Sequence, residues 1–105
     1  MKYIAYTFLG LAALFGANVT LAAGDAAAGA GKAASCAACH GANGQAAVPV
    51  YPSLAGQNEA YLVSSLQSYK NKQRSGGMSA IMEMQAANLS EQDIEDLAAY
   101  YAAMR

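Results

Sequence analysis

The segment Cys36-Ala37-Ala38-Cys39-His40 decides the fold, because it places two thiols and an imidazole within one short stretch of chain. Residues three apart on a helical turn lie on the same face, so both sulfur atoms can reach the two vinyl groups of one haem. The next residue then presents its imidazole beneath the iron. C-x-x-C-H is the attachment signature of c-type haem.

Other uses of the two thiols fit the sequence less well. A structural zinc site takes four protein ligands, and the chain has two cysteines and one histidine. A thioredoxin-like C-x-x-C is expected within a βαβ unit, and the sequence has no convincing strand. A plain disulfide would leave His40 without a purpose. Covalent haem is the preferred interpretation, and a dithiol redox site is the alternative left open.

Residues 1–22 have the pattern of a secretory signal peptide. Lys2 is the only charged side chain before Asp25, and a long apolar run follows it. Small residues precede the predicted cleavage point after Ala22. A retained N-terminal membrane anchor is the alternative, because the uncharged run is just long enough to span a bilayer. In either case the sequence predicts that residues 23–105 form an exported, periplasmic domain.

The exported part is poor in large apolar side chains. The 105-residue chain has room for one small domain, and its composition is 55% hydrophobic. However, both phenylalanines, Phe8 and Phe15, lie in the leader, and half of the later apolar residues are alanine. Such a domain needs a staple or an added core component. The length excludes a multidomain enzyme, and the net charge of −1 excludes a strongly basic nucleic-acid binder.

The remaining pattern predicts an all-α domain with three main helices and loops between them. An alanine-rich helix is predicted over residues 25–35, and a second over 58–74, where asparagine can cap its start. The third begins at Ser90, which forms a capping box with Asp93, and closes at Arg105. Its buried stripe is predicted to comprise Ile94, Leu97, Tyr101 and Met104.

Two loops are predicted between these helices. Residues 41–56 contain glycines and prolines typical of a loop. A short methionine-rich loop is predicted at residues 78–84, before the last helix. Gly29 in the first helix is predicted to permit a close crossing against Tyr100 or Tyr101 in the last.

The chain resembles bacterial class I cytochromes c, close to the single-domain monohaem type and to each half of the dihaem type. The resemblance covers essentially all of the exported part. It rests on the C-x-x-C-H motif and on the flanking segments 24–29, 51–57, 61–62 and 89–101. It implies a compact all-α fold around one covalently attached haem c.

Methionine is the second axial ligand in the resembling family, and His/Met ligation raises the haem potential. There the ligand typically stands eight residues before the serine that begins the last helix, which selects Met82. Met84 and Met78 are the alternatives, whereas Met104 is expected in the core. Methionines also fill gaps in ordinary cores.

The resemblance further implies contacts around the ligands. The carbonyl of Pro52 is expected to accept a hydrogen bond from His40, which would fix the histidine tautomer. Gln57, Tyr61 and Arg74 are expected to approach the haem or its propionates.

A six-coordinate iron has no open position, so the sequence predicts an electron carrier and not an enzyme. The expected partners are electron donor and acceptor proteins, such as quinol–cytochrome c reductase, a terminal oxidase or a periplasmic reductase. No nucleic-acid partner is expected, and a membrane is expected as a partner only if the leader is retained. The chain is expected to be a monomer or weak dimer. Ala46, Ala47 and Val48 are the hypothetical docking surface.

Two other functions are compatible with the sequence. One is a cytochrome subunit of a larger redox enzyme complex. The other is a gas-binding haem sensor, which requires that Met82 is not a stable ligand.

Overall fold

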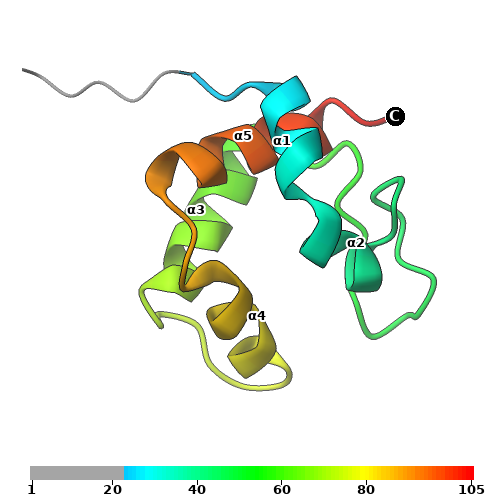
Figure 1. The fold of residues 1–105 in the computed structure, drawn as a ribbon. Helices are drawn as coiled ribbons and strands as arrows, with labels where there is room; N and C mark the ends of the chain where they lie inside the picture. Colours follow the sequence, from blue (N-terminus) through cyan, green and yellow to red (C-terminus); the bar gives the residue numbers. More distant parts are fainter. Residues whose placement is uncertain (1–22) are drawn as a thin grey trace, which may run out of the picture.

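The computed structural model describes residues 23–105, so the predicted signal peptide, residues 1–22, lies outside the described residues. The described part contains helices and no strand, which confirms the all-α prediction (Figure 1). None of its helices is long and apolar enough to cross a membrane. The helices are α1 (Ala26–Lys32), α2 (Ala34–His40), α3 (Glu59–Lys70), α4 (Ser79–Ala86) and α5 (Glu91–Ala102).

The helix predicted over residues 25–35 is interrupted: α1 ends at Lys32, and α2 begins at Ala34 and continues to His40. Asp25 begins α1, because its carboxylate accepts hydrogen bonds from the backbone N–H groups of Ala27 and Ala28 at 2.9 and 3.2 Å. The break falls at Ala33, whose φ and ψ of −89° and 0° are not helical. Ala33 is buried in the core. Gly31 weakens the helix two residues earlier, but the surrounding alanines favour its continuation, so the sequence pattern does not locate the bend.

The prediction of a methionine-rich loop is wrong, because most of that segment forms α4. No side chain caps this helix at Met78, and a pair of glycines precedes it, so the usual start signals are missing. Ala86 near its end is completely buried. Packing of α4 against α3 therefore supplies the stability that local signals do not indicate.

The predicted start of α5 is confirmed. Ser90 Oγ accepts a hydrogen bond from the backbone N–H of Asp93 at 3.0 Å, and Asp93 Oδ2 accepts one from the backbone N–H of Ser90 at 2.9 Å. These two bonds form the capping box. Three residues of the predicted stripe are buried: Ile94, Leu97 and Tyr101. The fourth, Met104, is half-buried.

The crossing of α1 and α5 depends on Gly29. A Cβ atom there would lie 2.1 Å from the backbone oxygen of Asp96 and 2.7 Å from Tyr100 Cβ. The two backbones therefore approach as closely as predicted, with Tyr100 at the contact. This crossing brings the first and last helices of the described chain together (Figure 1).

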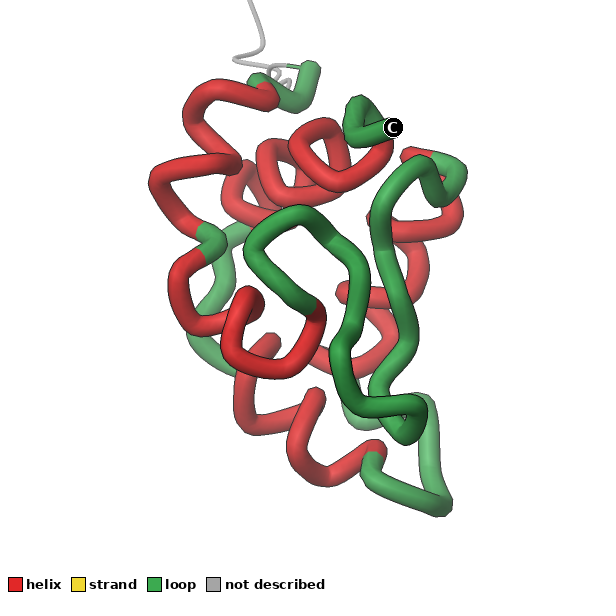
Figure 2. Tube along the Cα trace, turned by 90° about the vertical axis from the view of Figure 1, so that its right-hand side faces the viewer, coloured by secondary structure: helices red, strands yellow, loops and turns green. Residues whose placement is uncertain are grey.

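The long connection between α2 and α3 covers one side of the helices (Figure 2). It begins at Gly41, which ends α2 with a φ of 84°. A Cβ at Gly41 would lie 2.0 Å from the backbone oxygen of Gln45, so the turn directly after His40 requires glycine. The turn directs the chain back across the face of α2.

Candidate functional site

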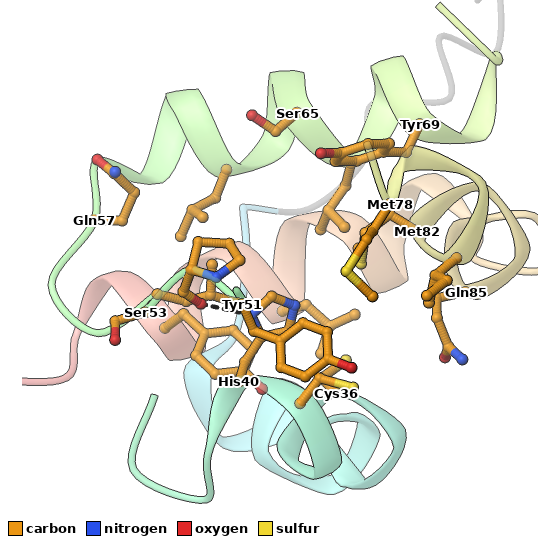
Figure 3. A pocket seen from close by; sticks show the side chains of 18 of the residues that line it. Cys36, His40, Tyr51, Ser53, Gln57, Ser65, Tyr69, Met78, Met82 and Gln85 are labelled. Carbon is orange, nitrogen blue, oxygen red and sulfur yellow. Dashed lines mark hydrogen bonds between the residues drawn. The ribbon is translucent and has the colours of Figure 1, made fainter. Parts of the chain in front are cut away.

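A cavity of about 390 Å³ lies between α2, the α2–α3 connection, α3, α4 and α5. Its wall contains the four residues that the sequence marks as attachment and axial positions: Cys36, Cys39, His40 and Met82. Methionine side chains enter from the side of α4, across the cavity from α2 (Figure 3). Residues more than 40 positions apart in the chain thus line one cavity.

His40 is buried and is oriented by the α2–α3 connection. Its Nδ1 donates a hydrogen bond to the carbonyl oxygen of Pro52 at 2.7 Å, the contact expected from the resemblance. A carbonyl can only accept, so this bond puts the proton on Nδ1 and leaves the Nε2 lone pair free. His40 can therefore bind a metal ion through Nε2.

Cys36 and Cys39 are half-buried free thiols on the cavity wall. Burial raises the pKa of the Cys36 thiol above its usual value, and contacts with Ser35 and Tyr101 offset only part of this effect. Thiols that take part in dithiol exchange have lowered pKa values in electropositive surroundings. The site therefore disfavours the dithiol redox alternative.

A metal site made only of protein ligands is not formed in the described part of the chain. Nowhere within residues 23–105 do three or more histidine, cysteine, aspartate or glutamate side chains converge.

The four methionines beyond the leader differ in their relation to the cavity. Met82 lies on the cavity wall and is half-buried, and Met78 also lies on this wall. Met84 is 77% exposed and lies off the wall. Met104 packs against the core, as predicted. Geometry thus leaves Met82 and Met78 as candidates and removes Met84.

Gln57, Tyr61 and Arg74 all line the cavity. The Arg74 guanidinium lies 4.8 Å from the centre of the Tyr69 ring, and its Nη2 donates to Tyr61 Oη at 3.4 Å. The bond from Arg74 lowers the pKa of Tyr61. No lysine or other arginine of residues 23–105 is on the wall, so Arg74 supplies its only permanent positive charge.

Part of the wall was not recognised as functional from the sequence. Tyr101 is predicted only as a core residue, and Tyr51 only as part of a segment that resembles the family. Both line the cavity, together with apolar side chains that include Leu62 and Leu97. The helical stripe in α5 shows that Tyr101 is buried, but no local signal indicates the cavity that it faces.

The donor set fits a covalently attached haem. Two thiols lie on one wall, an imidazole nitrogen is free beside them, and thioether sulfurs enter from across the cavity. The walls are otherwise largely apolar, as a macrocycle requires.

Comparisons with known sequences give a consistent result. The family model "Cytochrome c" matches residues 26–104. Cytochrome c-554(548) of Halomonas halodenitrificans is 52% identical over 80 residues, which are 76% of this chain and 96% of that protein. Cytochrome c4 of Pseudomonas aeruginosa is 48% identical over 86 residues, covering 80% of this chain and 40% of that one.

Solved structures agree with these matches. Reduced recombinant cytochrome c4 from Pseudomonas stutzeri superposes with a TM-score of 0.65 at 41% identity, covering 79% of this chain and 47% of that one. A thiosulfate dehydrogenase from Marichromatium purpuratum superposes with a TM-score of 0.71 at 35% identity, covering 78% of this chain and 20% of that one. The chain thus spans nearly all of cytochrome c-554(548) but less than half of cytochrome c4. It therefore belongs to the cytochrome c family as a monohaem electron carrier rather than an enzyme, with one haem c attached covalently through the motif at Cys36, Cys39 and His40.

Proposed function

We propose that the chain is a periplasmic electron-transfer protein whose haem iron is held between His40 and Met82, and that it shuttles single electrons between respiratory redox proteins. One observation carries the proposal: both side chains line the cavity that also holds the two attachment cysteines. His40 has its Nε2 free toward a metal because Pro52 occupies Nδ1.

The protein's own groups would hold the iron and close its coordination. Pro52 fixes the ring orientation of His40 through the 2.7 Å hydrogen bond. The Met82 thioether would occupy the sixth position and leave no place for a substrate. When bound, the haem supplies a one-electron ferric–ferrous couple, and His/Met ligation gives it a high potential.

Arg74 is proposed to pair with a haem propionate. Its position above Tyr69 and its bond to Tyr61 hold the guanidinium at the cavity wall. A guanidinium suits carboxylates because it can donate two parallel hydrogen bonds. Gln57, on the same wall, would supply an amide donor nearby.

Residues 1–22 are proposed to be the signal peptide and residues 23–105 the cytochrome domain. The family match at residues 26–104 lies wholly within that domain. Covalent attachment would then suit the protein, because an exported protein cannot replace haem that it loses. The mature N-terminus, measured by mass spectrometry, would test cleavage after Ala22.

Electrons would enter and leave where the haem edge meets solvent. Val48 and Val50 are 49% and 65% exposed in the connection after α2, and Val50 also lines the cavity. Ala47 is exposed beside them. These residues are proposed as the apolar docking surface for redox partners, which typically form small, transient complexes.

Absorption spectra of Met82→Ala and Met84→Ala in both oxidation states test the proposed ligation. Met82→Ala should lose the ferric Met–iron charge-transfer band. Met84→Ala is the matched control, because that side chain is exposed on the same helix and should leave the band unchanged. Survival of the band in Met82→Ala would exclude Met82, and Met78→Ala would then be the next variant. Carbon monoxide binding to the ferrous wild type would instead support a gas-binding sensor.

A second function is supported by the match to the thiosulfate dehydrogenase of M. purpuratum, of which this chain covers 20%. The chain would then act as a cytochrome subunit of a larger redox enzyme complex. Gel filtration of native extracts distinguishes the two functions. A diffusible carrier should elute near its own mass, and a subunit should elute with its complex.

A further inference from the structure

The hydroxyl of Tyr101 is a buried polar group without a hydrogen-bond partner in the structure. The side chain is 4% exposed and lines the cavity. Its Oη is the only buried side-chain nitrogen or oxygen in residues 23–105 that lacks such a partner. Buried polar groups in folded proteins are nearly always paired, so we expect this hydroxyl to have a hydrogen-bond partner in the complete site.

The Cys36 side chain packs against the buried cluster that contains Tyr101. The two side chains come from α5 and α2 and share the cavity wall. Each affects the other's pKa: contact with Tyr101 lowers that of the Cys36 thiol, while Cys36 adds to the effect of burial in raising that of Tyr101. The phenol therefore keeps its proton, and a donor faces the sulfur.

Attachment of the haem changes what the sulfur can do. A free thiol can donate as well as accept, whereas a thioether has no hydrogen and can only accept. The Tyr101 hydroxyl can then only donate toward it. We propose that Tyr101 is a positioning residue that donates a hydrogen bond to the Cys36 thioether sulfur and thereby raises the reduction potential of the haem. This inference rests on the haem attachment in the proposed function.

The direction of the effect follows from the orientation of the O–H dipole. Its positive end would point at a sulfur that is bonded to the edge of the macrocycle. Such a dipole favours the state that carries one more electron, and it acts strongly because the site is buried and its effective dielectric constant is low. Hydrogen bonding around the haem is an established means of setting its potential.

Tyr101→Phe tests the proposal with Tyr100→Phe as its matched control. Both variants remove one phenol oxygen from neighbouring positions of α5, and the two rings pack edge to face at 5.1 Å. Tyr100 is half-buried and does not line the cavity. At a fixed electrode potential, Tyr101→Phe should lower the reduced-to-oxidised ratio by more than about twofold and by at most about tenfold, the limit set by the net energy of one hydrogen bond. A tenfold change corresponds to about 59 mV for one electron.

Tyr100→Phe should change the ratio less than about twofold. Equal shifts in both variants, or no shift in Tyr101→Phe, would overturn the proposal.

Proton NMR of the reduced wild type provides a readout that does not depend on a variant. A slowly exchanging Tyr101 hydroxyl proton should show a nuclear Overhauser contact to the Cys36 β-protons. A hydroxyl that exchanges freely and shows no such contact would overturn the proposal, even if Tyr101→Phe failed to fold.

Failure of this inference is distinguishable from failure of the proposed function. If the wild type carries no covalent haem, as measured by mass spectrometry, the proposed function fails. If haem is attached but the Tyr101 results are negative, only the role of Tyr101 fails.

Discussion

The α1–α5 crossing is complete in polypeptide alone, whereas the side formed by α2, α3 and α4 surrounds a cavity. At the crossing, the Lys32 ammonium contacts Asp96 Oδ2 at 2.7 Å and Asp93 Oδ1 at 2.8 Å. Asp96 Oδ1 also accepts from the backbone N–H of Asp25 at 2.9 Å. On the other side, apolar side chains such as Met78 and Ile81 line the cavity and are 44% and 41% exposed. One half, the frame formed by α1 and α5, is held by polypeptide contacts alone, whereas the other half contains the cavity for the cofactor.

Removing the cofactor should have the largest effect on this comparison. The double variant Cys36→Ala/Cys39→Ala cannot attach haem, so the cavity side loses its main apolar component. Circular dichroism should show a largely unfolded chain, because a small domain with an alanine-rich interior is marginally stable. Wild-type protein with haem should melt cooperatively. Cooperative melting of the double variant would mean that the frame supports the whole fold.

Filling the helix crossing should have the next largest effect. Gly29→Ala places a Cβ atom 2.1 Å from the backbone oxygen of Asp96, so α1 and α5 must separate. The free energy of unfolding should fall by about 1–3 kcal/mol in denaturant titrations. Gly31→Ala is the matched control in the same helix, because a Cβ there meets nothing within 4 Å. It should stabilise the protein by about 0.5–1 kcal/mol; equal losses in both variants would contradict a tight crossing.

Acid should weaken the frame through Asp96. Lys32 first, then the bonds from Asp25 and Gln92, lower the pKa of Asp96 to about 2, below its value in the unfolded chain. A lowered pKa in the folded state stabilises the protein above the unfolded pKa, and this stabilisation is lost as the pH falls toward 2.

The free energy of unfolding of Asp96→Asn should therefore change less than that of the wild type as the pH falls from about 4 to 2. Acid titration followed by circular dichroism measures this. Glu95→Gln, a carboxylate next in sequence and outside the Lys32 contacts, should retain the wild-type profile. An unchanged profile in Asp96→Asn would show that Asp96 does not carry the acid sensitivity.

The smallest effects should come from the helix caps, one on each side of the comparison. Ser90 begins α5 with the two hydrogen bonds of the capping box. Asn58 begins α3 with one, which its side chain accepts from the backbone N–H of Tyr61 at 2.9 Å. Ser90→Ala and Asn58→Ala should each cost about 1 kcal/mol of unfolding free energy. Ser90→Ala should cost more. A larger loss in Asn58→Ala would show that α3 depends on local structure more than the frame does.

Local chemistry explains which parts were predictable from the sequence. The capping box at Ser90 and the attachment motif each act over a few residues, so their patterns are visible in the chain. The bend at Ala33 and the helix α4 have no such signals, because distant packing stabilises them.

The residues of the candidate site also divide into those with a local sequence signal and those placed by distant packing. The motif predicts Cys36, Cys39 and His40 directly. The family spacing adds Met82, and the resemblance adds the carbonyl of Pro52. The position of Tyr101 beside Cys36 depends on how α5 crosses the rest of the domain, which no local pattern records.

The frame also imposes an order in time. Its contacts join residues far apart in sequence: 71 positions separate Asp25 from Asp96, and 64 separate Lys32 from Asp96. A chain that emerges from its N-terminus first presents the two cysteines long before α5 is available to pack on α1. Closing a loop over such a separation costs more conformational entropy than closing a short one. In a chain that emerges in this way, both thiols are present before the contacts of the frame can form.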